Sequence, residues 1–398
     1  MAWILPGSFL FAEYASVVRS YIARHFERSL IVQLGQRLFL SEGTEEITAV
    51  LLADGRQQSM ERDGQFHLDF ASTLVDLREG IQAWVQGGGR ARRMNGRIGT
   101  AFLTDETAVS MQTVASAGRL LRIADIADVR IGIVTGANPF FVLGASTAAS
   151  HNLPESCLHP ILAKFSMAPG ASLTCADLEQ ARLKDQRCLL LDTGHPTLER
   201  KGSALRQYLA TMPRAKHHAN RTFKKRALWH QPDDRRNPDA FFPYMYHHGP
   251  RLILNEADTT STNTIHRVYF KTEAQPEGVS KNTWQKACAV SILSTFSQLS
   301  GELQGRCYGA GVLKHEPSEA GRIRLVSPEK LDARQVNRMF KQVDTALRNG
   351  QAEEARRLAD IFVLQALPPL ERERIIFILT GALDEARRRR RRAKSSNT

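Results

Sequence analysis

The sequence predicts an α/β fold followed by an α+β fold and a helical C-terminal extension, and three observations carry this prediction. The first residues alternate strand and helix patterns: an apolar strand over residues 3–5, a helix from Ser8, and apolar strands over residues 29–34 and 47–53. Short strand and helix patterns are mixed through the middle of the chain. From residue 326 onward only helix patterns remain, so three differently built regions follow one another.

The N-terminal helix is predicted from apolar residues spaced to share one helical face, namely Phe11, Tyr14, Val17, Val18 and Ile22. Ser8 is a residue type that caps helices, and Pro6-Gly7 ends the preceding strand. Asp54-Gly55 closes the unit after its last strand. Because the first strand begins at residue 2 with no earlier partner, we expect this unit to be the end of a larger sheet.

Residues 129–144 predict a β hairpin. An apolar run at residues 131–134 resumes at residues 140–143, and Thr135-Gly136-Ala137-Asn138 separates the two runs. Gly and Asn tolerate the positive φ that a tight turn requires. We expect two strands to hold a rigid polar tip that presents Thr135 and Asn138 to a ligand. The same pattern also occurs in hairpins that have no special role.

Residues 56–119 predict a connecting region. A strand is expected at residues 66–70, a helix at residues 72–86 that buries Leu74, Leu77, Ile81 and Trp84, and a second helix at residues 108–121. The basic loop at residues 90–97 lies between the two helices. Such a loop either contacts phosphate or is simply solvated.

Residues 214–226 form the most basic internal stretch, with no acidic residue among the cations Arg214, Lys216, Arg221, Lys224, Lys225 and Arg226. His217, His218, Phe223 and Trp229 are interleaved with them. Cations bind phosphates without reading sequence, whereas aromatic side chains stack on an unpaired base or wedge a base step. The stretch therefore predicts a DNA contact, and the alternative is a solvated basic loop with a core Trp229.

Two later strands are predicted at residues 252–255 and 265–270, with a polar loop at residues 259–264 between them. Asn255 and Asn263 have the groups to pair with an adenine edge, and Arg267 with a guanine, although loop asparagines also form turns. Residues 284–303 have the spacing of one helix. The Gly-rich turn at residues 305–311 either approaches phosphate or serves loop geometry alone.

The last segment predicts three helices, over residues 328–348, 352–367 and 370–387. Asn349-Gly350 and Pro368-Pro369 are the stop signals between them. Residues 387–398 predict a disordered basic tail. Such a tail either adds sequence-independent affinity for DNA or RNA or only improves solubility.

The composition is that of a folded protein with a polyanionic partner. The 398 residues are 42% hydrophobic and 24% charged, with a net charge of +13, which favours nucleic acid or an anionic membrane surface. The five cysteines, none spaced two residues apart, argue against a disulfide framework and a zinc ribbon and predict a reducing, cytoplasmic location. No apolar run approaches the roughly 18 residues of a membrane span. The histidine pairs at residues 217–218 and 247–248 lack partners for a metal ion, so no metal site is expected.

Several stretches together resemble one known family. MAWILPGSFLFAEYASVVRSYI resembles the fifth strand and following helix of the N6-adenine DNA methyltransferases of restriction-modification systems, the class with a C-terminal target-recognition domain. RSLIVQLGQRLFLSEGTEEITAVLLADG resembles the last two antiparallel strands of that catalytic fold. IGIVTGANPFFVL, RTFKKRALW, LILNEADTTSTNTIHRVYF and GELQGRCYGAGVLKHEPSE are similar to successive parts of the recognition domain. The order of these segments extends over about 300 residues.

The resemblance implies a domain order. Residues 1–55 would be the C-terminal strands of a Rossmann-like methyltransferase fold, 56–120 a linker or bridging region and 121–325 a mixed α/β DNA target-recognition domain. Residues 326–386 would be a helical extension and 387–398 a basic disordered tail. The DNA-contacting residues expected from the resemblance and the motifs are Thr135, Asn138, Arg221, Lys224, Lys225, Arg226, Trp229, Asn263, His266, Arg267, Arg306, Tyr308 and Lys314.

The family's catalytic motifs are missing from this sequence. Such enzymes bind S-adenosylmethionine at a Gly-rich turn after the first strand and grip the flipped adenine with an Asn-Pro-Pro-Tyr loop after the fourth. Gly87-Gly88-Gly89 follows a segment too short and polar to be that strand, and Asn138-Pro139-Phe140-Phe141 lacks the second proline and follows the last strands. No catalytic or cofactor-binding residue is therefore expected here. S-adenosylmethionine would belong to the complete enzyme only.

These inferences predict the DNA-recognition portion of a site-specific, S-adenosylmethionine-dependent DNA adenine-N6 methyltransferase. Its partners would be double-stranded DNA and a second polypeptide that carries the catalytic half, with no membrane, and this chain alone would not methylate. Two alternatives remain. One is a non-catalytic, sequence-specific DNA-binding or specificity protein, and the other is a complete enzyme whose active site lies around residues 138–141.

Overall fold

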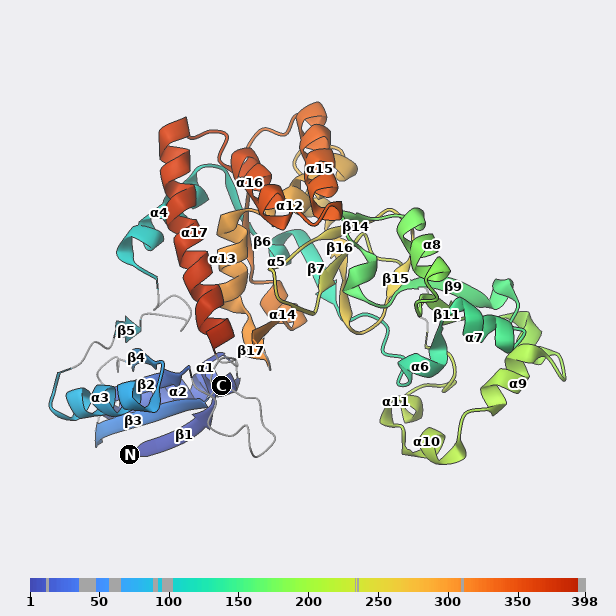
Figure 1. Cartoon of the computed structure of the whole chain (residues 1–398), viewed down its shortest axis with the longest axis horizontal. Helices are drawn as coiled ribbons and strands as arrows, with labels where there is room; N and C mark the ends of the chain where they lie inside the picture. The colour runs from blue at the N-terminus through green and yellow to red at the C-terminus, as the bar shows by residue number, and fades with distance from the viewer. Residues whose placement is uncertain are drawn as a thin grey trace.

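The computed structural model describes residues 1–11, 14–35, 48–56, 66–88, 92–94, 103–232, 234, 236–308 and 311–392. Figure 1 shows three parts: an N-terminal sheet with its helices, a central body of strands and helices, and a lobe at the opposite end of the view. The mixed α/β class predicted from the sequence is confirmed, because helices and several sheets alternate along the chain. The Rossmann-like assignment and the division into domains stay predictions.

The N-terminal sheet has the strand order β1-β3-β2-β4-β5. Strand β3 is antiparallel to β1 and β2, whereas β2 and β4 are parallel. The strands predicted at residues 29–34, 47–53 and 66–70 are confirmed, and all three lie in this sheet. Its elements are β1 (Ala2–Pro6), α1 (Ser8–Phe11), α2 (Tyr14–His25), β2 (Phe26–Leu34), β3 (Thr48–Arg56), β4 (Phe66–Ala71), α3 (Leu74–Val85) and β5 (Arg92–Met94).

Helices α2 and α3 cover opposite faces of this sheet. Alternate residues of a strand point to opposite faces, so Ile31 packs with Ile22 of α2, while Leu30 packs with Trp84 of α3. The predicted buried face of the first helix is wrong in part, because Val17 and Val18 are exposed. The side chains of Phe11 and Tyr14 lie outside the described residues, as does most of the basic loop at residues 90–97.

The central body is built around a five-stranded sheet of order β10-β14-β12-β16-β7, with a helical layer against it. Its elements are α4 (Asp105–Ser116), β6 (Arg119–Arg122), α5 (Ile123–Ile126), β7 (Ala127–Arg130), β10 (Ser172–Leu173), α8 (Cys175–Leu183), β12 (Ala240–Pro243), β13 (Met245–Tyr246), β14 (Ile253–Asn255), β16 (Ile265–Phe270), α12 (Lys281–Ser291), α13 (Thr295–Gln304), β17 (Arg306–Tyr308), β18 (Val312–Lys314), α14 (Pro317–Ala320), β19 (Arg324–Ser327), α15 (Ala333–Arg348), α16 (Ala352–Val363) and α17 (Pro369–Arg392). The strands predicted at residues 252–255 and 265–270 are confirmed as β14 and β16.

Helix α15 shows how the sequence directs packing in this body. Val336, Phe340, Val343 and Leu347 follow one another at intervals of three or four residues, and all four are buried. The helix ends at the predicted stop signal, where Gly350 adopts the left-handed conformation with φ +74° that glycine accepts without strain.

Two predicted helices of the body are shorter than expected. The helix predicted over residues 108–121 ends at Ser116, because residues 119–122 form β6 and pair with β19. The helix predicted over residues 284–303 is two helices, α12 and α13. Ser294 lies between them, and its hydroxyl accepts a hydrogen bond from the Ser297 N–H of the second helix.

The lobe holds a four-stranded sheet of order β15-β9-β11-β8 and a set of short helices. Its elements are α6 (Asn138–Phe141), β8 (Val142–Leu143), α7 (Ala145–Ser150), β9 (Leu158–Leu162), β11 (Leu189–Leu191), α9 (Ala204–Ala210), α10 (Arg214–Ala219), α11 (Arg221–Lys224) and β15 (Thr260–Ser261). Figure 1 places α10 and α11 together at the lower end of this lobe. The polar loop predicted at residues 259–264 contains β15, and its threonines from 259 to 262 are buried.

The hairpin predicted over residues 129–144 is wrong. Strand β7 pairs with β16 in the body, β8 pairs with β11 in the lobe, and the short helix α6 lies between them. Ile133 forms an isolated bridge with Thr262. The two apolar runs therefore belong to different sheets, and this segment joins the body to the lobe.

The basic tail predicted from residue 387 is also wrong in its first half, since α17 continues through the arginines to Arg392. Arg390 is buried. Residues 393–398 lie outside the described residues. Among the helices that the structure describes, none is long and apolar enough to cross a membrane.

Candidate nucleic-acid interface

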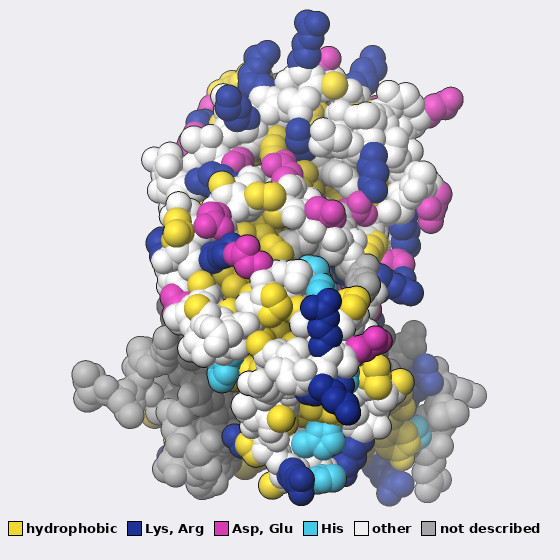
Figure 2. All heavy atoms as spheres, turned by 90° about the vertical axis from the view of Figure 1, so that its right-hand side faces the viewer, with side chains coloured by type: hydrophobic (Ala, Val, Ile, Leu, Met, Phe, Trp, Pro, Cys, Tyr) yellow, Lys and Arg dark blue, Asp and Glu magenta, His cyan; other side chains and the backbone are white. Residues whose placement is uncertain are grey.

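Helices α10 and α11 carry an exposed basic surface. It consists of the exposed side chains of Arg214, Lys216, His218, Arg221, Lys224 and Lys225. In Figure 2 Lys, Arg and His side chains gather at the lower end of the lobe, and the acidic side chains visible in this view lie higher. Asn220 joins the two helices. Its side-chain oxygen accepts from the Thr222 and Phe223 N–H groups, at 2.9 and 3.3 Å, and caps α11.

An aromatic cluster supports this surface from below. The Trp229 ring lies 5.2 Å from the Phe223 ring, 6.1 Å from Phe141 and 4.7 Å from His217, measured between centroids. Phe141 and Phe223 are buried, and Trp229 is half-buried against them. The role predicted for Trp229 in stacking on a base is therefore not supported. The cluster instead holds α10 and α11 on the lobe.

Arg226 connects the basic surface to the segment that enters the lobe. Its guanidinium donates to the carbonyls of Thr135 at 2.9 Å and Trp229 at 3.2 Å, and also to the carbonyl of Val134. Burial lowers the pKa of this guanidinium. Arg226 therefore fixes the loop between two segments, which corrects its predicted role as a phosphate contact.

The two asparagines and the threonine predicted to read bases form one hydrogen-bonded chain. The Thr135 hydroxyl donates to Asn138 Oδ1 at 2.5 Å, and Asn138 Nδ2 donates to Asn263 Oδ1 at 3.2 Å. Bidentate pairing with adenine requires both the oxygen and the nitrogen of one amide. Asn138 has both atoms engaged within the protein, and Thr135 is buried. These two are therefore positioning residues, and Asn263 is the member with a half-exposed side chain.

His266 and Arg267 lie inside the protein, so their predicted base contacts are wrong. The His266 ring is buried, bonds through Nε2 to the His315 carbonyl at 2.8 Å, and has its pKa lowered by burial. Arg267 forms a bidentate pair with Asp234 at 2.8 Å for both bonds. Burial alone would raise the pKa of Asp234, but the hydrogen bonds from Arg267 lower it overall. An arginine held in this way stabilises β16.

Arg306 and Lys314 face each other across the β17–β18 hairpin, and each has a carboxylate partner. Arg306 pairs with Glu319, and Lys314 Nζ lies 3.0 Å from Glu316. Both cations are mostly buried, so their predicted DNA contacts do not fit. Tyr308 belongs to β17, but its side chain lies outside the described residues.

Residues 96–364 match the protein-family model described as the type II methyltransferase M.Eco57I, C-terminal domain. The chain belongs to this family. The match begins after β5, includes the lobe with its basic surface, and covers the central body except for its last helix, α17. It confirms the resemblance to the methyltransferases of restriction-modification systems.

The chain is also similar to two solved structures. One is the type IIG restriction endonuclease BpuSI, with a TM-score of 0.46 at 14% identity, covering 99% of this chain and 48% of that one. The other is a DrdV–DNA complex, with a TM-score of 0.32 at 8% identity, covering 94% of this chain and 50% of that one. This chain thus spans about half the length of both.

The two sequence segments that look like the catalytic motifs of such methyltransferases do not fit S-adenosylmethionine or an adenine. Gly87, with φ +80°, follows helix α3, whereas the donor-binding turn follows a strand. In the segment Asn138–Phe141, the Phe140 ring stacks on Tyr208 at 4.7 Å and Phe141 is buried. The buried Phe141 therefore leaves no ring face open to a base.

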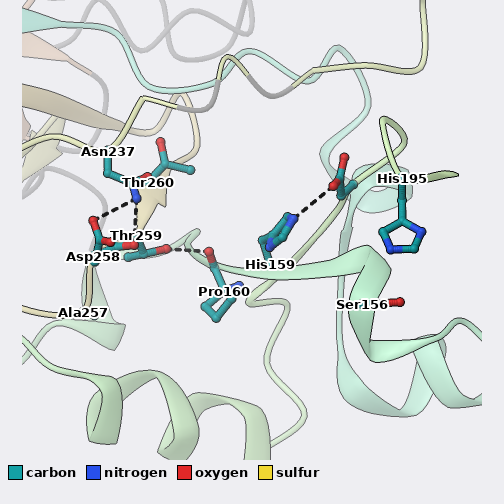
Figure 3. Close-up of a pocket in the computed structure, with 10 residues that line it drawn as sticks. Ser156, His159, Pro160, His195, Asn237, Ala257, Asp258, Thr259 and Thr260 are labelled. Carbon is teal, nitrogen blue, oxygen red and sulfur yellow. Dashed lines mark hydrogen bonds and ion pairs between the residues drawn. The ribbon is translucent and has the colours of Figure 1, made fainter.

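A polar pocket of about 420 Å³ lies in the lobe of this family member, beside β9, β11 and β15 (Figure 3). His159 Nε2 lies 3.1 Å from Asp192 Oδ2 on one side, and Asn237 Nδ2 lies 3.0 Å from Asp258 Oδ1 on the other. His195 Nδ1 accepts from the Thr197 N–H at 3.2 Å, which leaves Nε2 as the proton-bearing nitrogen of the neutral ring. The pocket offers hydrogen-bonding groups of both kinds.

This pocket is not predictable from the sequence, because its residues come from separate segments. His159, Asp192, His195 and Asn237 are far apart in the chain and match no motif spacing. Within the part of the chain that the structure describes, no group of three or more His, Cys, Asp or Glu side chains is arranged to hold a metal ion.

Proposed function

We propose that this chain is the DNA-recognition portion of a site-specific, S-adenosylmethionine-dependent DNA adenine-N6 methyltransferase. In this proposal the basic surface on α10 and α11 binds the phosphates of double-stranded DNA. The observation that carries it is the exposure of six cationic or histidine side chains on two short helices, fixed to the lobe by Arg226 and the aromatic cluster. Fixed cations bind the DNA backbone at a low entropic cost.

The position of Asn263 supports sequence reading beside that surface. Its Oδ1 accepts from Asn138, so the side-chain NH₂ group is the part that remains to donate to a base edge. Asn138 accepts a hydrogen bond from the Thr135 hydroxyl, and the Thr135 carbonyl accepts one from Arg226. We propose that phosphate contacts by α10 and α11 set the register and that Asn263 contacts a base.

The test compares two triple variants of equal charge change. Arg221→Ala, Lys224→Ala and Lys225→Ala together remove three cations of the basic surface. Each phosphate contact contributes about 0.9 to the slope of log affinity against log salt concentration, so we expect the slope to fall by about 2 to 3 and the affinity at low salt to fall roughly a hundredfold. Fluorescence anisotropy with labelled duplex DNA at several salt concentrations measures both.

The matched control is Lys330→Ala, Arg338→Ala and Lys341→Ala, which removes one arginine and two lysines that are exposed elsewhere on the body. We expect this control to change affinity only a few-fold, through the loss of net charge. Equal losses in both triple variants would contradict a DNA contact at α10 and α11. Salt-independent binding by the unmodified chain would contradict the proposal as a whole.

The methyl-donor site and the adenine-gripping loop are proposed to come from a second polypeptide. The exposed side of the N-terminal sheet supports this. Strand β1 is an edge strand, and its Trp3 and Ile4 side chains are exposed, as are Val17 and Tyr21 on α2. An edge strand with exposed apolar residues is a template for a further strand.

Two measurements test this part of the proposal. The purified chain should transfer no methyl group from radiolabelled S-adenosylmethionine to DNA, and the DNA immediately upstream of the Met1 codon should encode a strand, a Gly-rich turn and an Asn-Pro-Pro-Tyr loop. Methyl transfer by the chain alone, lost in Asn138→Ala, would favour a complete enzyme instead. Duplex binding without the upstream motifs would favour a non-catalytic specificity protein.

A further inference from the structure

Leu228 is a large apolar side chain that stays exposed beside the basic surface. It is 53% exposed and follows Lys224 and Lys225 in the chain. A single exposed leucine is common on protein surfaces and by itself indicates nothing. What distinguishes Leu228 is the way the structure holds the backbone on both sides of it.

The loop that carries Leu228 is fixed by hydrogen bonds before and after this residue. Before it, the Arg226 guanidinium donates to the Thr135 carbonyl at 2.9 Å and reaches over to the Trp229 carbonyl at 3.2 Å. After it, the Gln231 N–H donates to the Leu228 carbonyl at 3.1 Å and closes a turn.

The residues that follow Leu228 are tied to the lobe as well. The Thr193 hydroxyl donates to the His230 carbonyl at 2.7 Å. Trp229, the next residue, directs its ring inward against Phe223 and Phe141. Leu228 is therefore presented from a rigid support, and little conformational entropy is lost when it enters a binding site.

The charges on the segment that precedes Leu228 suit a nucleic acid better than an apolar protein partner. Arg221, Lys224 and Lys225 are exposed on the helix that leads into the loop. Cations that neutralise neighbouring phosphates, together with one projecting apolar side chain, are the components with which proteins pry apart a base step and bend DNA.

We propose that Leu228 inserts between two adjacent base pairs of the bound duplex, as a wedge that unstacks one base step and bends the DNA there. This inference rests on the proposed DNA-binding function of the basic surface. In this proposal, Lys224 and Lys225 bind the DNA backbone on either side of the step. Arg226 and Trp229 fix the conformation of the loop that carries Leu228. The specificity gained is for a base step that unstacks easily, such as a pyrimidine–purine step.

The experiment uses the full chain and a duplex that the unmodified chain selects from a random-sequence library. Leu228→Ala removes the wedge, Leu228→Phe keeps an apolar side chain able to insert, and Leu183→Ala is the control, because Leu183 is a 70% exposed leucine at the end of α8. Each protein is measured for affinity, for its salt slope, and for DNA bending by energy transfer between dyes at the duplex ends.

We expect Leu228→Ala to bind about tenfold more weakly and to lose most of the bend, with an unchanged salt slope because the phosphate contacts remain. Leu228→Phe should bend the DNA, and Leu183→Ala should behave as the unmodified chain. Binding and bending of Leu228→Ala at the level of the unmodified chain overturns the wedge and leaves the proposed function standing. A failure of the unmodified chain to bind any duplex overturns both.

Discussion

Two stretches of this chain each carry six positively charged side chains but have different structural roles. Residues 214–226 mix arginines and lysines with other residues, residues 387–392 are all arginine, and both were predicted from the sequence to contact nucleic acid. In the first stretch most cations are exposed on two short helices. In the second the last turns of α17 are packed on the body.

The helix period explains the difference at the C-terminal stretch. Arg387 and Arg390 are three residues apart, so both lie on the face of α17 that meets α13. Arg390 Nε and Nη2 bond to the Glu302 carboxylate at 2.9 and 2.8 Å, and Arg387 Nη2 bonds to the His248 carbonyl at 2.9 Å. Arg388, on another face, has a side chain that is 56% exposed. The number of arginines in the sequence does not tell which of them are buried. The buried carboxylate of Glu302 determines which arginines pack against the body.

The strongest test of the contrast is Arg390→Ala. Glu302 would keep only Arg387, whose Nε lies 3.7 Å from its carboxylate, and would be left buried without its closest partner. Breaking a buried pair in this way costs about 3–5 kcal/mol. We therefore expect the free energy of unfolding, measured with urea, to fall by about 3 kcal/mol. The affinity of the folded protein for DNA should not change.

The matched control for that substitution is Arg388→Ala, in the same helix and one turn from the same end. Among the residues that the structure describes, its side chain forms an ion pair with Glu385 at the surface, so the expected change in stability is within about 0.5 kcal/mol. If both substitutions reduce DNA affinity and spare stability, the C-terminal arginines bind DNA and the contrast fails.

A second test uses acid. His315 is fully buried between the Tyr246 hydroxyl at 2.8 Å and the Gly301 carbonyl at 3.0 Å, and burial lowers its pKa to about 3. The unfolded chain, with a pKa of about 6.5, takes up a proton that the folded chain excludes. Stability is therefore lost as the pH falls from about 6.5 towards 3, on the order of 3 kcal/mol by pH 4.

The comparison for the acid test is His315→Gln, which removes the titrating group. We expect a flatter dependence of the unfolding free energy on pH than in the unmodified chain, measured with urea at a series of pH values. Parallel pH profiles for the two proteins would refute a role for His315. The basic surface should respond to salt in this pH range, since its lysines and arginines keep their charges.

The smallest expected effect lies within the basic stretch itself. Arg226→Lys keeps the positive charge but loses the planar fork that reaches several carbonyls, so we expect a loss of about 1–2 kcal/mol in stability and a few-fold loss in DNA affinity. The salt slope should stay the same. Arg226→Gln removes the charge, and a reduced slope in that variant would show that Arg226 contacts a phosphate. Lys224→Arg is the control, because it changes the head group at an exposed position.

The sequence predicts the local elements well where one periodic run decides them. The strands of the N-terminal sheet and helix α15 are examples, because their apolar residues recur at the period of the structure that forms. The segment from residue 129 to 144 was mispredicted for the opposite reason. Its two apolar runs read as partners of each other, but β7 and β8 pair with β16 and β11, which come from distant parts of the chain.

The candidate site is predictable only in its exposed part. Arg221, Lys224 and Lys225 are predicted by charge alone, and the structure leaves them exposed. Arg267 and Arg306 look the same in the sequence, but Asp234 and Glu319 pair with them. Trp229 was left open between a base contact and a core residue, and its neighbours Phe141 and Phe223 place it against the core. Such partners are set by the three-dimensional fold, which spacing does not reveal.

The pairing of β7 with β16 also sets the order in which the protein takes shape during synthesis. Arg130 of β7 lies opposite Arg267 of β16. Strand β7 therefore cannot pair in the central sheet until more than about a hundred further residues have left the ribosome. Helix α17 is later still, and it packs against α13 and against α4 near the start of the body. At about 5–20 residues per second, the body remains open for many seconds after the N-terminal sheet has been made. Apolar surface of the body therefore stays exposed to solvent over that interval.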